Sequence, residues 1–272
     1  MADVSAEIPG DRVIAANRAL LADAVREAGA LALSLFRTEL KNWTKGASSP
    51  VSEADIAVND LLERRLRPAS PGYGWLSEES ADDFTRLDQR LLWVVDPIDG
   101  TRNYLAGKED WCVSVALVDN GAPLLAALFA PAHDEFFFAA RGQGASCNGR
   151  PLQATSGTAL DFARVAGPKP LVERMKKALG EITLHPRIGS LALRLCRVAD
   201  GGLDAAFAGG NSHDWDLAAA DLIVHEADGR LTALSGDAIC YNRREVTHGV
   251  LVAAGRDRHA EIIEHFRHPP LP

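Results

Sequence analysis

The sequence has no long apolar run, no amino-terminal signal pattern and no excess of basic residues. Its longest uninterrupted apolar segment, residues 124–130, is far shorter than the ~20 residues that a membrane-spanning helix needs. The first ten residues contain neither the basic region nor the apolar region of a secretory signal. These absences predict a cytoplasmic protein that does not bind a membrane.

The sign of the charge also limits the partners. The formal net charge is −8 at pH 7, whereas proteins that bind nucleic-acid duplexes are usually basic. We therefore expect that the protein does not bind a nucleic-acid duplex. If the substrate is an anion, bound cations must reverse the local field, because the chain itself is acidic.

Paired cysteines and the common nucleophile motifs are absent. The four cysteines, Cys112, Cys147, Cys196 and Cys240, are widely spaced and form no C-x-x-C pair. We interpret them as reduced packing residues, because a disulfide framework or a structural zinc site needs closer spacing. The sequence has no G-x-S-x-G motif. Residues 100–108 do not form a phosphate-binding P-loop, since the glycines are too far apart and no serine or threonine follows the lysine.

The apolar residues that are present predict an α+β first half. The chain has 272 residues, of which 47% are hydrophobic, and this suits one domain or two fused halves. Helical spacing predicts one helix over residues 11–37 and a second that follows Pro50 and ends before Pro68. Alternating segments and an Asn148-Gly149 turn predict an antiparallel sheet, with strands at residues 91–95, 112–118, 124–129 and 135–139.

The second half alternates helices with short strands. Helices are predicted at residues 169–180, 190–200, 215–227 and 257–267, and strands at residues 205–208, 231–234 and 250–253. This pattern indicates an α/β half packed on the α+β half. We place the boundary near residue 155, with halves at 1–155 and 156–272. The sequence shows no repeat and no Gly/Ser linker, so we expect one compact unit.

The most informative segment runs from Trp93 to Thr101. An apolar strand there leads into Asp96 and Asp99, Pro97 fixes the backbone between them, and Gly100 permits a sharp turn. Two carboxylates three residues apart at a strand end are well placed to share a hard cation, which prefers oxygen ligands. The alternative is that both acids only cap the helix that Thr101 begins.

Two other segments carry acids in suggestive positions. Glu78 and Glu79 follow a short predicted strand, and Asp216 lies at the start of an Ala-rich helix. Taken alone, the first is typical of a solvated loop and the second of a helix cap. His213, beside the second segment, suggests zinc, but a set of four carboxylates favours a harder metal.

Together these segments resemble the inositol monophosphatase superfamily of magnesium-dependent, lithium-sensitive phosphatases. The family pattern is a Glu-Glu pair, then D-P-[IL]-D-G-T, then W-D-x-A-A, and the sequence has all three in order. The segments 52–55 and 189–202 match as well. The resemblance implies a layered α-β-α-β-α sandwich, two to three Mg²⁺ ions with Mn²⁺ possible, a small-molecule phosphate ester as substrate, and a homodimer.

The resemblance also implies residue roles. One metal is held by Glu78, Asp96 and the Ile98 carbonyl, a second by Asp96, Asp99 and Asp216, and a weaker third uses Glu78. The attacking water is bonded to Thr101, which Asp55 orients, so Asp55, Thr101 and Glu78 are the expected catalytic residues. The expected substrate contacts are Gly100, Thr101, Arg102, Gly189, Ser190 and Asp216.

The substrate is less well defined. Inositol-type members carry a glutamate a few residues before the W-D motif, where this chain has Ala208 or Gly209. The 76–79 and 108–111 segments and Arg102 resemble bacterial 3′(2′),5′-bisphosphate nucleotidases, whereas Asn103-Tyr104 is closer to the inositol type. We interpret the chain first as such a nucleotidase. Inositol-1-monophosphatase, histidinol-phosphate phosphatase or another sugar-phosphate phosphatase are the alternatives.

A bisphosphate substrate needs a cation outside the carboxylate cluster. Arg102 is the first candidate, and the others are Lys45, Lys108, Arg187 and Arg194. A catalytically silent binding relative is the alternative that is not an enzyme. It is disfavoured because the chain keeps Thr101 and every acid of the pattern.

Overall fold

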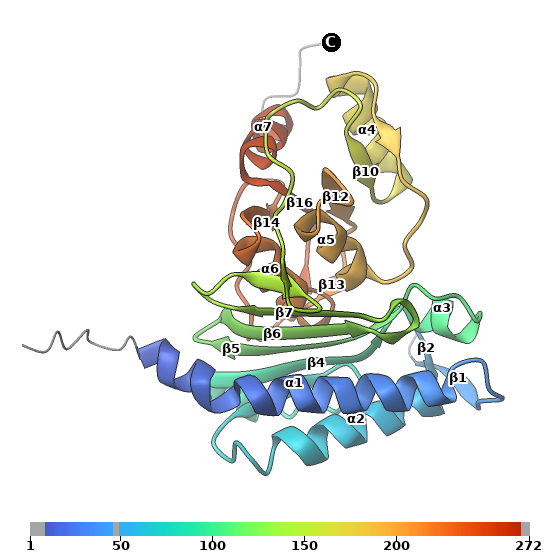
Figure 1. Ribbon diagram of the computed structural model, residues 1–272, viewed down its shortest axis with the longest axis vertical. Helices are drawn as coiled ribbons and strands as arrows, with labels where there is room; N and C mark the ends of the chain where they lie inside the picture. The colour runs from blue at the N-terminus through green and yellow to red at the C-terminus, as the bar shows by residue number, and fades with distance from the viewer. Residues whose placement is uncertain (1–8, 46–48, 268–272) are drawn as a thin grey trace, which may run out of the picture.

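The computed structural model describes residues 9–45 and 49–267 and has five alternating layers of helices and sheets (Figure 1). Below the larger sheet in Figure 1 lie two helices, α1 (Pro9–Leu35) and α2 (Glu53–Leu66). Between the sheets lie α5 (Leu191–Ala199) and α6 (Asp214–Glu226). The outermost layer consists of α4 (Lys169–Leu179) and α7 (Arg256–Arg267). This arrangement is the layered sandwich that the sequence predicts.

The larger sheet has seven strands in sequential order. They are β3 (Gly74–Ser77), β4 (Leu91–Asp99), β5 (Cys112–Asp119), β6 (Ala122–Ala130), β7 (Glu135–Ala140), β8 (Ala145–Cys147) and β9 (Arg150–Pro151). All neighbours from β4 onward pair antiparallel, as predicted, and the predicted turn joins β8 to β9 with positive φ at both Asn148 and Gly149. Only β3 is parallel to its neighbour, which sets Ser77 opposite Val95. The parallel pairing therefore brings the residue after β3, Glu78, to the same sheet edge as Asp96.

The smaller sheet is mixed. Its order is β11 (Thr183–Leu184), β10 (Arg164–Ala166), β12 (Ala205–Ala208), β16 (Leu251–Gly255) and β14 (Gly229–Ala233). Strand β10 is parallel to both neighbours, and β16 is antiparallel to both of its own. The three predicted strands of this half are confirmed within two residues. Strands β10 and β11 were not predicted, because two or three residues are too few to show a period.

Short elements complete the chain. They are the β1 (Asn42–Lys45) and β2 (Ser49–Ser52) pair, α3 (Thr101–Leu105), the β13 (Ser212–His213) and β15 (Thr247–His248) pair, and the 3₁₀ turns Thr85–Asp88 and Pro131–His133. Of these, only the α3 helix after Gly100 was predicted. The four cysteines are free. Among the described residues, no helix is both long and apolar enough to cross a membrane.

After Asp216, the first half of helix α6 is apolar because the helix lies between the two sheets and beside α5, whereas Asp221, His225 and Glu226 follow in its second half. Its residues Leu217 to Ala220 are almost completely buried, in the same core as strands from both sheets. A helical segment that is buried all round has no polar face to present. Its alanines leave room for both sheets to approach. The Ala-rich sequence after the W-D motif is therefore a requirement of the central layer.

A buried histidine of the outer layer predicts sensitivity to acid. His259 on α7 contacts Thr232 Oγ1 on β14 at 2.9 Å. Burial, with His225 and Arg230 nearby, lowers the pKa of His259 to about 4 from an ordinary 6.5. Its neutral form therefore contributes stability that is fully present above about pH 6.5 and is lost as the pH falls toward 4. We expect His259→Gln to lose less unfolding free energy than the wild type between about pH 7 and pH 4. Urea unfolding at both pH values tests this, and parallel losses would contradict it.

Candidate active site

The carboxyl end of β4 places two acids on one face of the sheet. Asp96 pairs with Ser114, and Asp99 pairs with Cys112. An advance of three residues along β4 therefore matches an advance of only two residues along β5. This bulge cancels the alternation that would otherwise send Asp96 and Asp99 to opposite faces. Gly100 then turns the chain with φ of +96°, and a side chain there would come within 2.9 Å of the Asp110 carbonyl oxygen. The D-P-I-D-G motif is thus a bulged strand end followed by an obligatory glycine.

Asp96 is the site residue whose buried carboxylate is not satisfied by hydrogen bonds from the part of the chain that the structure describes. Its side chain is buried, and neither carboxylate oxygen has a hydrogen-bond partner among the described residues. Burial raises the pKa of Asp96 well above its usual value, and the charges of Glu78, Asp99 and Asp216 raise it further. A buried acid without a partner is rare in a stable fold. A bound cation would satisfy both oxygens.

Asp99 is held by the start of α5. Its Oδ2 accepts hydrogen bonds from Ser190 Oγ at 2.5 Å and from the Ala192 backbone N–H at 2.6 Å. Burial and the charge of Asp216 nevertheless raise the pKa of Asp99 to about 6. Ser190 is predicted as a substrate contact, but its side chain is fully buried and donates to Asp99. We therefore propose that Ser190 positions Asp99.

Asp216 comes from the first turn of α6. Its Oδ2 accepts a hydrogen bond from the His213 backbone N–H at 2.6 Å, so Asp216 belongs to a capping box whose N-cap residue is His213 rather than being the N-cap itself. One carboxylate oxygen from each of Asp96, Asp99 and Asp216 lies within 4.8 Å of the others. Three oxygen ligands at this separation fit a single divalent cation. The neighbouring Asp214 is used differently, since it is buried and bonded to His248 Nε2 at 2.6 Å.

Glu78 faces the same cluster from the end of β3. Burial raises the pKa of Glu78 to about 8, and the charges of Asp216 and Glu79 contribute. Lys45 partly offsets this, because its Nζ donates to the Glu78 carbonyl oxygen at 2.6 Å and to Glu79 Oε2 at 2.8 Å. Lys45 is a predicted candidate for a substrate phosphate, but in this structure it pairs with the acidic loop.

Thr101 and Asp55 lie 46 positions apart and meet in space, as the sequence analysis expects. Thr101 Oγ1 lies 3.0 Å from Asp55 Oδ1 and 2.9 Å from the Ile98 carbonyl oxygen. The other Asp55 oxygen accepts hydrogen bonds from Ser52, whose backbone N–H is 2.8 Å away, at the start of α2. Asp55 therefore caps its helix with one oxygen and holds Thr101 with the other. Burial raises its pKa despite these bonds.

Most of the predicted site residues line one cleft of about 220 Å³. It is lined by Pro50, Glu78, Asp96, Ile98, Asp99, Gly100, Thr101, Arg102, Asn103, Arg187, Gly189 and Asp216. Asp55 and Ser190 lie buried behind this lining. Lys108 and Arg194 do not line the cleft, although Arg194 lines the neighbouring cavity. Pro50 was not predicted as a site residue, because β2 shows no sequence pattern of its own.

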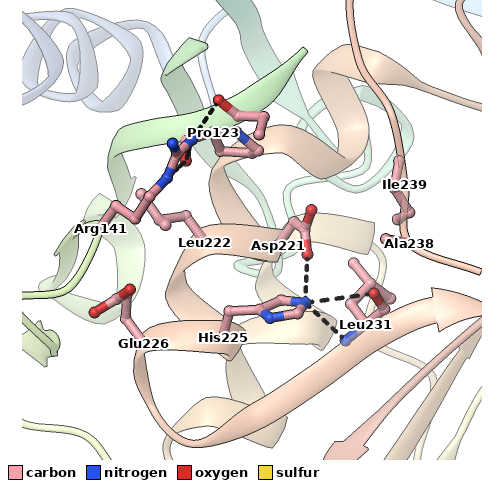
Figure 2. Close-up of a pocket in the computed structure, with 10 residues that line it drawn as sticks. Pro123, Arg141, Asp221, Leu222, His225, Glu226, Leu231, Ala238 and Ile239 are labelled. Atoms are coloured by element: carbon pink, nitrogen blue, oxygen red, sulfur yellow. Dashed lines mark hydrogen bonds and ion pairs between the residues drawn. The ribbon is translucent and has the colours of Figure 1, made fainter. Parts of the chain in front are cut away.

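A more apolar cavity lies elsewhere on α6, about 280 Å³ in volume (Figure 2). Figure 2 shows His225 turned toward Asp221, whose Oδ1 is 3.2 Å from His225 Nε2. Arg141 in the same view donates to the Pro123 carbonyl oxygen. These groups are paired with one another and converge on no common point. The carboxylate cleft is therefore the better candidate for chemistry.

The fold and this cleft define a class of protein: a layered sandwich with buried carboxylates gathered at the end of a sheet. Comparisons with known proteins agree. The model of the "Inositol monophosphatase family" matches residues 15–269. The chain is 35% identical to an inositol-1-monophosphatase of Rhizobium meliloti, with 71% of this chain and 75% of the relative covered. It is 36% identical to a histidinol-phosphatase of Mycobacterium tuberculosis, with 73% and 79% covered.

A solved structure is also similar. The extragenic suppressor protein suhB of Bartonella henselae superimposes with a TM-score of 0.82 at 26% identity, covering 93% of this chain and 99% of that one. The chain therefore belongs to the inositol monophosphatase family. Fold, site and family together make it a phosphatase, that is, a phosphoric monoester hydrolase.

Replacing Asp96 by asparagine tests the cluster. Asp96→Asn keeps the side-chain shape and removes a charge that has no bonded partner. We expect it to lose most magnesium-dependent phosphatase activity. Without metal it should melt higher than the wild type at about pH 8, by roughly 2–4 °C if the buried charge costs ~1 kcal/mol. Added Mg²⁺ should raise the melting temperature of the wild type and shift the variant less.

The exposed Asp60→Asn on α2 is the matched control and should behave as the wild type. Near-normal magnesium-dependent activity in Asp96→Asn would contradict the proposed role of this residue.

Proposed function

We propose that the chain hydrolyses a small phosphate monoester with Mg²⁺ as its cofactor. The observation that carries this proposal is Asp96, a buried carboxylate with no hydrogen-bond partner among the described residues, facing two further acids. The described lining of the cleft offers carboxylate and carbonyl oxygens but no histidine or cysteine, and such oxygen ligands suit Mg²⁺ or Mn²⁺ better than zinc. A silent binding relative would have no need to keep this strained set of acids intact.

Five residues would hold the metal ions. They are Asp96, the acids Glu78, Asp99 and Asp216 whose charges act on it, and Ile98, which lines the same cleft and would contribute its carbonyl oxygen. Bound ions would neutralise the carboxylates, polarise the phosphoryl group and lower the pKa of a water molecule. Burial, and then the repulsion among these acids, raises the pKa values of Glu78 and Asp99, and bound cations would relieve both effects.

Thr101 and Asp55 would orient the attacking water. A hydroxyl carries one proton, and when Thr101 donates it to Asp55 the lone pairs of Thr101 Oγ1 are free to accept a hydrogen bond from water. That bond would hold the water for attack on phosphorus: the water oxygen attaches to phosphorus, the ester phosphorus–oxygen bond breaks, and the leaving oxygen takes up a proton and departs as the alcohol. Glu78 also lines the cleft and is the remaining candidate to receive the proton of the water.

The phosphoryl group would lie over the turn at Gly100. The backbone N–H groups at the start of a helical turn lack partners within that turn, so those of Gly100 and Thr101 can donate to phosphate oxygens. Gly189 lines the cleft opposite, where a side chain would collide with Asn103. Arg102 lines the same cleft and is a proposed contact of the substrate.

For the substrate, we propose a 3′(2′),5′-bisphosphate nucleotide. The described lining of the cleft holds no carboxylate beyond the four expected metal ligands, and its cations are Arg102 and Arg187. The position at which inositol-type members carry glutamate is Ala208 or Gly209 here, and Ala208 is buried in β12. A site without an acid for sugar hydroxyls, and with cations at its rim, favours a second negative charge. The names of the relatives point to inositol 1-phosphate and histidinol phosphate as alternatives.

Removing the Thr101 hydroxyl tests the proposed dyad. We expect Thr101→Val to lower kcat by about 10²-fold or more, within the range for a lost proton-transfer or orienting group, with a smaller change in KM. Thr101→Ser keeps the hydroxyl and should retain most of the activity. Initial-rate kinetics with Mg²⁺ measure both variants. If the valine variant were as active as the serine variant, the dyad would be wrong.

A substrate panel tests the proposed specificity. Phosphate release with Mg²⁺ is measured from adenosine 3′,5′-bisphosphate, inositol 1-phosphate and histidinol phosphate, with chelator as the control. We expect all release to require the metal and the bisphosphate to have the highest kcat/KM. A strong preference for inositol 1-phosphate would refute the nucleotidase assignment and leave the phosphatase class intact.

A further inference from the structure

A second cavity lies directly beside the carboxylate cleft. Its volume is about 560 Å³, compared with about 220 Å³ for the cleft, and Arg187 lines both. The walls are the loop after β10, residues 166–169, the segment 184–188, and Arg194 on the first turn of α5. The volume is in the range of pockets that hold a nucleoside-sized ligand.

The charge of this cavity is opposite to that of the chain. Its lining, as far as the structure describes the chain, includes Lys169, Arg187 and Arg194, together with His185, and no aspartate or glutamate. The whole chain carries −8. The carboxylate cleft next to it is the most acidic part of the site. A substrate that spans both cavities would therefore meet an acidic, metal-binding end and a basic end.

Arg194 is the cation that most needs a partner. Its side chain is largely buried, and the Nε atom has no hydrogen-bond partner among the described residues. Burial lowers its pKa and the nearby charge of Arg187 lowers it further, while Asp99 partly compensates. A guanidinium stays protonated in proteins, so the unmet hydrogen-bonding capacity persists at neutral pH. An anion in the cavity would satisfy it.

Arg194 is also tied to the reaction site by the backbone. It lies two residues after Ala192, whose N–H holds Asp99 Oδ2 at 2.6 Å, and four after Ser190, which donates to the same oxygen. The helix turn that fixes a proposed metal ligand therefore also fixes the cation. The distance between the two ends of a bound substrate is set by one rigid element.

We propose that this basic cavity receives a second anionic group carried by the leaving alcohol of the substrate. The inference rests on the proposed phosphatase function, because it assigns the phosphoryl group to the carboxylate cleft. It defines the substrate class as phosphate monoesters whose alcohol bears a further phosphate or a carboxylate. Esters with a cationic alcohol, such as histidinol phosphate, are disfavoured by like charge.

Matched substrate pairs measure this preference. Adenosine 3′,5′-bisphosphate is compared with adenosine 3′-monophosphate, which lacks the second phosphate. Glycerol 3-phosphate is compared with 3-phosphoglycerate, which adds a carboxylate. The readout is the selectivity, defined as the ratio of kcat/KM for the more highly charged member to that for its partner. We expect a selectivity of at least about tenfold in one pair or both, as a charge-assisted hydrogen bond would give, and the pair that shows it identifies the anion.

Variants of the cavity then locate the effect. Arg194→Met should lower the selectivity by about tenfold or more, mainly through KM of the more highly charged substrate. Lys169→Ala, on an exposed residue, tests the same cavity if the buried substitution disturbs folding, which circular dichroism melting reports. Lys176→Ala, an exposed lysine further along α4 that does not line the cavity, is the matched control and should keep the wild-type selectivity.

Three results would overturn the inference. One is a wild-type selectivity near one in both pairs. Another is an unchanged selectivity in a folded Lys169→Ala/Arg194→Met double variant. The third is a loss of selectivity in Arg102→Ala without any loss in the double variant. That result would place the second anion over α3. Failure of the proposed function is distinct, because then no ester of either pair would release phosphate with Mg²⁺.

Discussion

The crowding of buried carboxylates at one sheet edge is the constraint on which the rest of this structure depends. Asp96 is enclosed without a bonded partner, and burial together with its acidic neighbours raises the pKa values of Glu78 and Asp99 to about 8 and about 6. A fold tolerates such a cluster only if the surrounding elements hold it rigidly. The acids are anchored by α5 and α6 and surrounded by an extensive apolar core.

The acids reach the cluster from three different elements, β3, β4 and α6. A bulge in β4 turns Asp96 and Asp99 to the same face, and the parallel pairing of β3 brings Glu78 beside them. Asp216 enters on the first turn of α6, from the part of the chain beyond residue 155. Helix α5 holds Asp99 with its first turn and presents Arg194 to the neighbouring basic cavity. The site therefore exists only when both sheets and the helices between them are assembled.

The sequence predicted much of the fold because long periodic segments carry their own signal. The helices from α1 to α7, other than the single-turn α3, and the main strands were found from apolar spacing, and the turn at Asn148-Gly149 was found from its dipeptide. Strands β10, β11 and the β1–β2 pair escaped, because they are at most four residues long and are stabilised by their neighbours in the sheet. The division of the chain at residue 155 stays a prediction, although it falls between the two sheets.

By itself, the sequence determined the types of residue available and their local geometry. These are the carboxylates of the D-P-I-D-G-T and W-D segments, the glycine that the turn after Asp99 requires, and the capping boxes that contain Asp55 and Asp216. Those features depend only on neighbours along the chain. Only the tertiary structure decided which residues share a cleft. Lys45 pairs with the acidic loop, Ser190 lies buried behind Asp99, and Arg194 lines a separate cavity. Such distinctions depend on which face of an element meets which neighbour, and no local pattern encodes that.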